Sequence, residues 1–136
     1  MESLELRHRI MQAVKSKNTG PELLVRRLLH ANGYRYRLHS NKLPGCPDLV
    51  FPGRKKVVFV HGCWWHGHDC TRGSRIPKTN IDYWTKKVFR NRTRDLASRK
   101  QLQSEGWTVL VLWECQLRDE ALILKRLVRF LRYDTE

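Results

Sequence analysis

The sequence predicts a single α/β domain in which a small mixed β-sheet is flanked by helices. The chain has 136 residues, the size of one domain with one modest core. Apolar residues make up 40% and charged residues 29%, a globular composition. Short apolar runs alternate with longer segments whose apolar residues recur at helical spacing. Because no repeat or linker divides residues 1–136, we expect one domain.

The first predicted elements are helical. Residues 4–14 fit a short helix or arm within an N-terminal segment, 1–18. SKNTGPE then reads as a helix start, because Thr19 can cap the helix and Pro21 suits its first turn. Gly33 supplies the stop.

Three strand-like runs follow: YRYRL from Tyr34, DLVF from Asp48 and VVFVH from Val57. PGRKK, between the last two runs, fits a hairpin turn. Such a hairpin places Asp48, which opens one strand, and His61, which ends the next, at the same end of the sheet.

The C-terminal half predicts helix, strand and helix. A long basic helix is expected from about Asn80 to Ser104, before Gly106, and its inward candidates are Trp84, Val88, Leu96 and Leu102. WTVLVLW is a nearly continuous apolar strand, which we expect to be buried on both faces. The last helix, about Glu120 to Arg132, has apolar residues at helical spacing: Leu124, Leu127, Val128 and Leu131.

The charge indicates the partner. The chain carries 27 Lys and Arg against 13 Asp and Glu, a formal net charge of +14. Such a surface favours nucleic acid, because neutralising phosphates releases counterions, although a solubilised surface is the alternative. No apolar run approaches the roughly 20 residues that span a bilayer, and a secretory signal is lacking. We expect no membrane partner and a cytoplasmic, nucleoid-associated location.

Asp48 and His61 are the first candidate site. An acid there can hold a divalent cation against a phosphate while a neighbouring side chain steers water. The arrangement also matches a PD-(D/E)xK-like nuclease core, with His61 where that core usually carries an acid and a lysine. On spacing alone the alternative stays open that Asp48 caps a turn and His61 is a polar strand end.

HGCWWHGHDC predicts a structural zinc site, because cysteines without an export signal are more plausible as metal ligands than as disulfides. Cys63, Cys70 and one histidine make three ligands, and Cys115 is the natural fourth. In an extended loop His66 and His68 point in opposite directions, so one can bind zinc while the other faces the reaction centre. The alternative is buried thiols with incidental histidines.

LPGCPDLVF, FVHGCWWHGHDC and NRTRDLASRKQLQSEGWTVLVLWEC together resemble the very-short-patch repair endonuclease family, over roughly Ile10 to Leu117. The resemblance implies an enzyme that hydrolyses DNA on the 5′ side of the thymine in a T·G mismatch left by deamination of 5-methylcytosine. It also implies magnesium, with two ions at Asp48 and one ligand from the Val60 carbonyl.

The resemblance implies further roles. His61 would interact with the scissile phosphate region, His66 would be the general base, Asp95 would orient the base or water, and Glu22 would hold metal-bound water. Zinc would be bound by Cys63, His68, Cys70 and Cys115, which leaves Cys46 outside. Adjacent aromatics usually mean core, but here the resemblance implies that Trp64 and Trp65 intercalate beside the mismatch, opposite Met11.

Two rival functions remain. One is a sequence-specific restriction or nicking endonuclease on the same core, and the other is a non-catalytic zinc DNA-binding module. Gly67, Asp69 and Cys46 depart from the family pattern, which affects the expected target sequence rather than the nuclease prediction. We expect a monomer acting on double-stranded DNA, with mismatch-repair proteins as possible partners.

Overall fold

The computed structural model describes residues 19–63, 66, 68, 70 and 79–133. The predicted helix or arm at 4–14 therefore lies outside the described residues. The elements are helix α2 (Gly20–Ala31), strands β1 (Arg37–Leu38), β2 (Leu49–Phe51) and β3 (Lys56–His61), helix α3 (Ile81–Ser104), strand β4 (Thr108–Trp113) and helix α4 (Glu120–Arg132). Short 3-10 helices follow β2, at Pro52–Arg54, and β4, at Glu114–Arg118.

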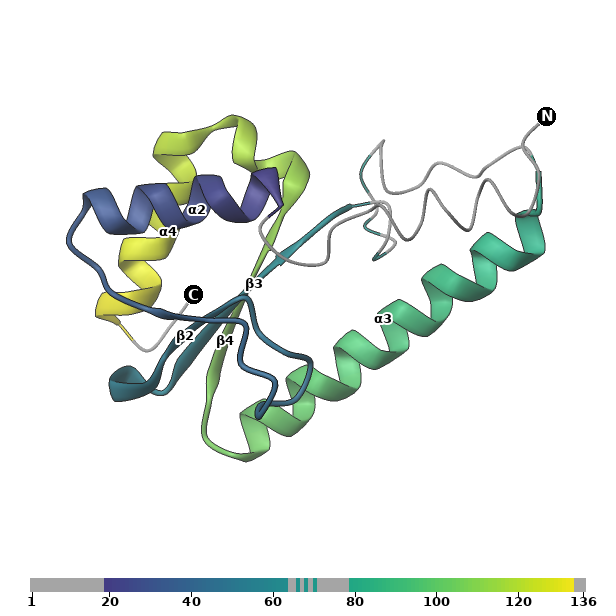
Figure 1. The fold of residues 1–136 in the computed structure, drawn as a ribbon, viewed down its shortest axis with the longest axis horizontal. Helices are drawn as coiled ribbons and strands as arrows, with labels where there is room; N and C mark the ends of the chain where they lie inside the picture. Colours follow the sequence, from purple (N-terminus) through teal and green to yellow (C-terminus); the bar gives the residue numbers. More distant parts are fainter. Residues whose placement is uncertain (1–18, 64–65, 67, 69, 71–78, 134–136) are drawn as a thin grey trace.

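The four strands form one sheet in the order β1-β2-β3-β4. The first two pairings are antiparallel and β3 pairs with β4 in parallel, so the sheet is mixed, as predicted. In Figure 1, α2 and α4 lie together on one side of the sheet, and α3 runs along the other side and extends past it. This arrangement confirms the predicted α/β class with flanking helices.

Two apolar clusters form because successive strand residues point to opposite faces. The larger cluster joins α2 and α4 to the sheet: Val25, Leu29, Leu49, Phe51, Val58, Leu110, Leu112, Leu117, Ile123, Leu127, Phe130 and Leu131. The smaller one lies under the C-terminal end of α3: Val50, Val57, Phe59, Leu102 and Val109. The end of the sheet that carries Asp48 and His61 is therefore held between two packed layers.

The helix ends follow the predicted local signals. The Thr19 hydroxyl accepts a hydrogen bond from the Glu22 N–H and caps α2. Gly33, after the helix, has φ +85°, a left-handed conformation that glycine adopts without strain. Helix α4 has the predicted bounds, and the Asp119 carboxylate caps it through the Leu122 N–H.

Three predictions were wrong in detail. The run from Tyr34 is a strand only at Arg37–Leu38, because the Tyr34 N–H is still bonded to the Leu29 carbonyl at the helix end. Leu96 is 56% exposed, since its neighbour Asp95 takes the inward position on α3. Strand β4 is only partly buried. Helices α2 and α4 cover one face of the sheet more fully than α3 covers the other.

Among the described helices, none combines the length and apolarity that a membrane crossing requires.

Candidate active site and metal clusters

The β2–β3 hairpin brings Asp48 and His61 to one end of the sheet, as predicted. Asp48 directly precedes β2, and its Oδ2 accepts a hydrogen bond of 2.7 Å from the Val60 N–H near the end of β3. His61 is the next residue and the last of β3. Because neighbouring strand residues face opposite ways, Val60 lies against Asp48 while His61 faces α3.

A buried acidic group lies beside Asp48 on the side of α2. Glu22 is 1% exposed, and its Oε2 accepts a hydrogen bond of 3.3 Å from Arg26 Nη1. His39 Nε2 lies 2.8 and 2.9 Å from the two oxygens of Glu22. One donor atom from each of Glu22, His39 and Asp48 lies within 4.8 Å of the others.

The Asp48 carboxylate is in a setting that opposes its charge. Burial raises the pKa of Asp48 from 3.8 to about 7, the nearby Glu22 adds to the rise, and the Val60 N–H works against it. A bound cation would stabilise the ionised form of Asp48, and Glu22 supplies a second carboxylate close by. The residues present therefore fit a divalent metal ion at this end of the sheet.

A second cluster contains His61, His66 and Asp95. His66 Nδ1 lies 2.5 Å from Asp95 Oδ2, and His61 Nδ1 lies 4.0 Å from the same oxygen. The two imidazoles stack, with centroids 3.9 Å apart and planes 7° apart. Asp95, on α3, therefore hydrogen bonds His66 and lies near the stacked ring of His61.

His61 differs from His66 in its exposure. Its ring is buried, and its Nδ1 has no hydrogen-bond partner among the residues that the structure describes. Burial lowers the pKa of His61 to about 4, and the neighbouring His66 contributes. His61 is therefore neutral near pH 7, whereas Asp95 can hold the His66 ring in a fixed orientation.

The cysteines and His68 form a third cluster. Ligand atoms of Cys63, His68, Cys70 and Cys115 all lie within 4.8 Å of one another. Cys115 Sγ is 3.6 Å from His68 Nδ1, and the Cys115 N–H donates to Cys63 Sγ at 3.3 Å. Burial raises the pKa of the Cys63 thiol to about 12.

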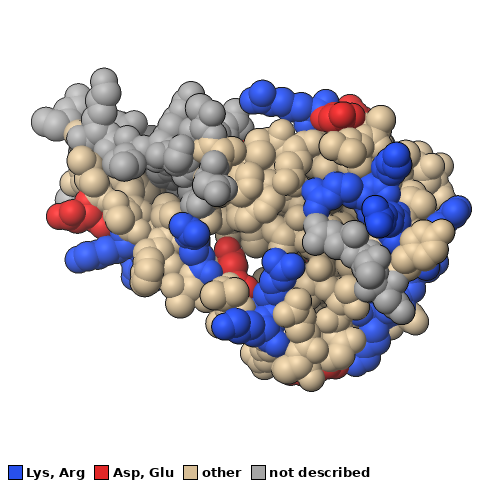
Figure 2. Space-filling view, turned by 180° about the vertical axis from the view of Figure 1, so that it is seen from behind, with Lys and Arg blue, Asp and Glu red and all other residues tan. Residues whose placement is uncertain are grey.

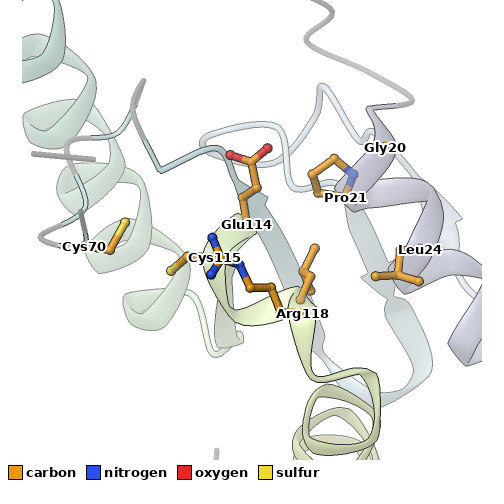
Figure 3. A pocket seen from close by; sticks show the side chains of 8 residues that line it. Gly20, Pro21, Leu24, Cys70, Glu114, Cys115 and Arg118 are labelled. Carbon is orange, nitrogen blue, oxygen red and sulfur yellow. The ribbon is translucent and has the colours of Figure 1, made fainter. Parts of the chain in front are cut away.

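Three thiols and an imidazole are the donor set of a structural zinc site. In Figure 3 the sulfur atoms of Cys70 and Cys115 point toward each other, next to a cavity of about 480 Å³. The cavity is also lined by Pro21 and Leu24 of α2 and by Glu114 and Arg118. Cys46 is exposed and lies outside the cluster. The cluster can hold a metal ion, and its identity as zinc stays a prediction.

Two side chains near these clusters were missed by the sequence analysis. Trp113 was predicted only as part of a strand, with no role at the site. Its ring stacks on His68, with centroids 4.2 Å apart, and contacts His61 edge-on at 5.2 Å. His39 lies in a polar stretch with no motif that would single it out. Trp64, Trp65 and Met11, and the departures Gly67 and Asp69, lie outside the described residues.

Basic residues are widespread on the surface. Seen from behind, Lys and Arg side chains gather around a hollow that contains an acidic side chain (Figure 2). A groove of about 600 Å³ between α3 and the sheet is lined by His61, His66 and Asp95 together with Arg92 and Arg99. Guanidinium groups beside the histidine cluster suit a phosphate backbone.

The family model described as DNA mismatch endonuclease Vsr matches residues 3–72. A protein named type II nicking enzyme V.XorIIP, from Xanthomonas oryzae pv. oryzae, is 53% identical over 125 residues, which cover 92% of this chain and 91% of that protein. The type II nicking enzyme V.NmeAIP of Neisseria meningitidis is 43% identical, over 90% of this chain and 87% of the relative. The DNA mismatch endonuclease Vsr of Escherichia coli is 38% identical, over 85% of this chain and 78% of the relative.

Proposed function

Because the chain belongs to the Vsr family and is a DNA endonuclease, we propose that it nicks one strand 5′ of the thymine at a T·G mismatch. The reaction would require magnesium and would initiate very-short-patch repair of deaminated 5-methylcytosine. The E. coli relative is named a mismatch endonuclease, which supports a mismatch as the substrate.

One observation carries this proposal: two chemically different clusters meet at the end of β3. Val60 contacts Asp48 on one side, and His61 faces Asp95 and His66 on the other. A phosphodiester placed across this strand end would meet carboxylates on one side and imidazoles on the other. Hydrolysis needs both groups, whereas binding alone needs neither.

The residues divide the chemistry between them. Asp48 and the Val60 carbonyl would hold Mg²⁺, and Glu22 would orient water. The resemblance implies two magnesium ions. When bound, Mg²⁺ neutralises charge that develops on the phosphate. His66 accepts a proton from the attacking water, and Asp95 stabilises the imidazolium that results. His61, neutral near pH 7, donates a hydrogen bond to a phosphate oxygen.

We assign zinc to Cys63, His68, Cys70 and Cys115 as a structural ion. A closed four-ligand site contributes to folding directly and needs no open position. It would hold the loop around His66 in place. Mismatch recognition is assigned to Trp64 and Trp65 with Met11 on the opposite groove, because stacking an aromatic ring on an opened base step recovers roughly 1–3 kcal/mol per base.

The test is a labelled duplex with a single T·G mismatch, incubated beside its matched control with and without Mg²⁺. We expect one nick, on the thymine strand, only in the mismatched duplex with Mg²⁺. Asp48→Ala should abolish nicking but keep DNA affinity, which comes mainly from Lys and Arg on phosphates. Trp65→Ala should nick both duplexes with similar efficiency. Full activity in chelator would overturn the metal assignment.

A second candidate function is sequence-specific nicking without a mismatch. Two of the relatives above are named type II nicking enzymes, which supports it. Equal nicking of matched and mismatched duplexes by the wild type, at one sequence, would favour this candidate. A non-catalytic zinc module is not retained, because the relatives are named as nucleases.

We also propose that one monomer acts on double-stranded DNA. The net charge of +14 belongs to a single chain, so one copy of the protein carries enough positive charge to attract DNA. Sedimentation of the protein alone and with a short duplex measures the stoichiometry, and a 2:1 complex would contradict a monomer. Recruitment by mismatch-repair proteins and a nucleoid location stay predictions.

A further inference from the structure

His39 occupies an unusual position beside the two carboxylates. Its backbone has φ +45°, a left-handed conformation that non-glycine residues rarely adopt. Its N–H donates to the Asp48 carbonyl at 3.1 Å, which ties it to the start of β2. The side chain is 14% exposed and turns inward to Glu22. The backbone thus accepts a disfavoured conformation that brings the imidazole to the acidic cluster.

The His39 nitrogen has the spacing of a metal ligand. Its Nε2 lies 2.8 and 2.9 Å from the Glu22 oxygens, and a donor atom of Asp48 completes a set within 4.8 Å. The three donor atoms therefore lie close enough to surround one cation, either directly or through a bound water. The three donors also come from separate segments, so their convergence requires the tertiary fold.

We propose that His39 is a direct ligand of the catalytic cation, so that this site binds a first-row transition cation such as Mn²⁺ more tightly than Mg²⁺. The proposal rests on the proposed function, which assigns a divalent cation to Asp48. It adds a nitrogen ligand to a set that the resemblance describes with oxygen ligands only.

The preference follows from ligand chemistry. Mg²⁺ binds preferentially to carboxylate and water oxygens, and an imidazole ligand adds little to its affinity. Mn²⁺ and the later transition ions accept nitrogen ligands readily. Arg26, bonded to Glu22, lowers the net negative charge of the cluster. Because the carboxylate charge is partly offset, the attraction of the cluster for a cation depends more on the imidazole nitrogen of His39.

The experiment measures binding of Mn²⁺ and of Mg²⁺ by calorimetry, on full-length protein loaded with zinc and without DNA. Free Mn²⁺ is counted independently by its electron paramagnetic resonance signal. The variants are His39→Gln and His39→Asn, and His30→Gln is the matched control on the exposed surface of α2. Asparagine tolerates the left-handed backbone, so a folded variant is available if glutamine is not accommodated.

We expect both His39 variants to weaken Mn²⁺ binding by about 10- to 100-fold and Mg²⁺ binding much less, while His30→Gln changes neither. An equal loss for the two cations would mean that His39 only hydrogen bonds Glu22 and would overturn the proposal. Unchanged Mn²⁺ binding would overturn it as well. If wild type nicks no T·G duplex with either cation, the proposed function fails, whatever the binding ratio shows.

Discussion

The indole of Trp113 lies flat against the imidazole of His68, with planes 14° apart and centroids 4.2 Å apart. The same indole meets His61 edge-on at 5.2 Å and His66 at 6.3 Å. One side chain at the end of β4 therefore contacts both the Cys/His cluster and the histidines beside Asp95. The orientation of the two histidines depends on the ring that packs against the proposed zinc ligand.

Trp113→Leu should lower kcat by roughly ten- to a hundredfold, because small misplacements of reacting groups have effects of that size. The zinc content should be unchanged, since all four proposed ligands remain, and KM for the duplex should change little. Trp107→Leu is the control, because it removes an indole from the far end of the same strand region. Equal loss of kcat in both variants would show a general packing effect instead.

The raised pKa of Asp48 predicts that the stability of the protein depends on pH. Between pH 3.8, its ordinary pKa, and about 7, the folded protein holds a proton that the unfolded chain has released. The free energy of unfolding therefore falls as pH rises through this window. Without divalent cations, wild type should lose stability relative to Asp48→Asn from about pH 4 to about pH 7.

The measurement is the melting temperature of both proteins across that pH range, with chelator and then with Mg²⁺. Added Mg²⁺ should stabilise wild type most above about pH 7, because the cation no longer competes with the proton. It should have little effect on Asp48→Asn. Parallel pH curves for the two proteins would contradict the raised pKa of the half-buried Asp48 carboxyl.

Asp95→Asn tests the orientation of His66. The amide preserves shape but cannot stabilise an imidazolium, so we expect kcat to fall by about 10²- to 10⁴-fold. DNA affinity should stay near that of wild type. Single-turnover nicking and duplex binding, measured side by side, separate these effects. A variant with wild-type single-turnover rate would remove Asp95 from the mechanism.

Cys115→Ala should lower the bound zinc and the melting temperature together. A loss of about 3 kcal/mol would correspond to roughly 10 °C for a domain of this size. Cys46→Ala is the matched control, since Cys46 is exposed and outside the cluster, and it should keep both properties. Purified wild type without zinc by elemental analysis would contradict the assignment.

The parts of the fold that local chemistry determines were predictable. Thr19 and Pro21 mark the start of α2, and the apolar spacing from Glu120 to Arg132 gives α4 its bounds. The turn after Phe51 also brings Asp48 and His61 together, because a short hairpin allows few registers. These features depend on neighbours a few residues apart.

Contacts between distant segments were not predictable in the same way. His39 reaches Glu22, 17 positions earlier, only through a left-handed backbone that no sequence pattern indicates. Leu96 has the spacing of an inward residue, yet Asp95 faces the histidines instead. The family resemblance supplied what spacing could not: it assigned roles to Glu22 and Asp95, which otherwise look like ordinary helix charges.

Gly45 gives a last test, because it sets how the Asp48 loop packs on α3. Its φ is +76°, and an added Cβ would lie 2.8 Å from the Cβ of Ser98, one turn beyond Asp95, and 3.2 Å from the Phe59 ring. Gly45→Ala must therefore push the loop away from α3 and strain its backbone. We expect a lower melting temperature and a loss of kcat, as Asp48 moves relative to Asp95. Gly53→Ala is the control, since nothing lies within 4 Å of its added Cβ. If Gly45→Ala melts and nicks like Gly53→Ala, the loop is free to adjust, and its contact with Ser98 does not position Asp48.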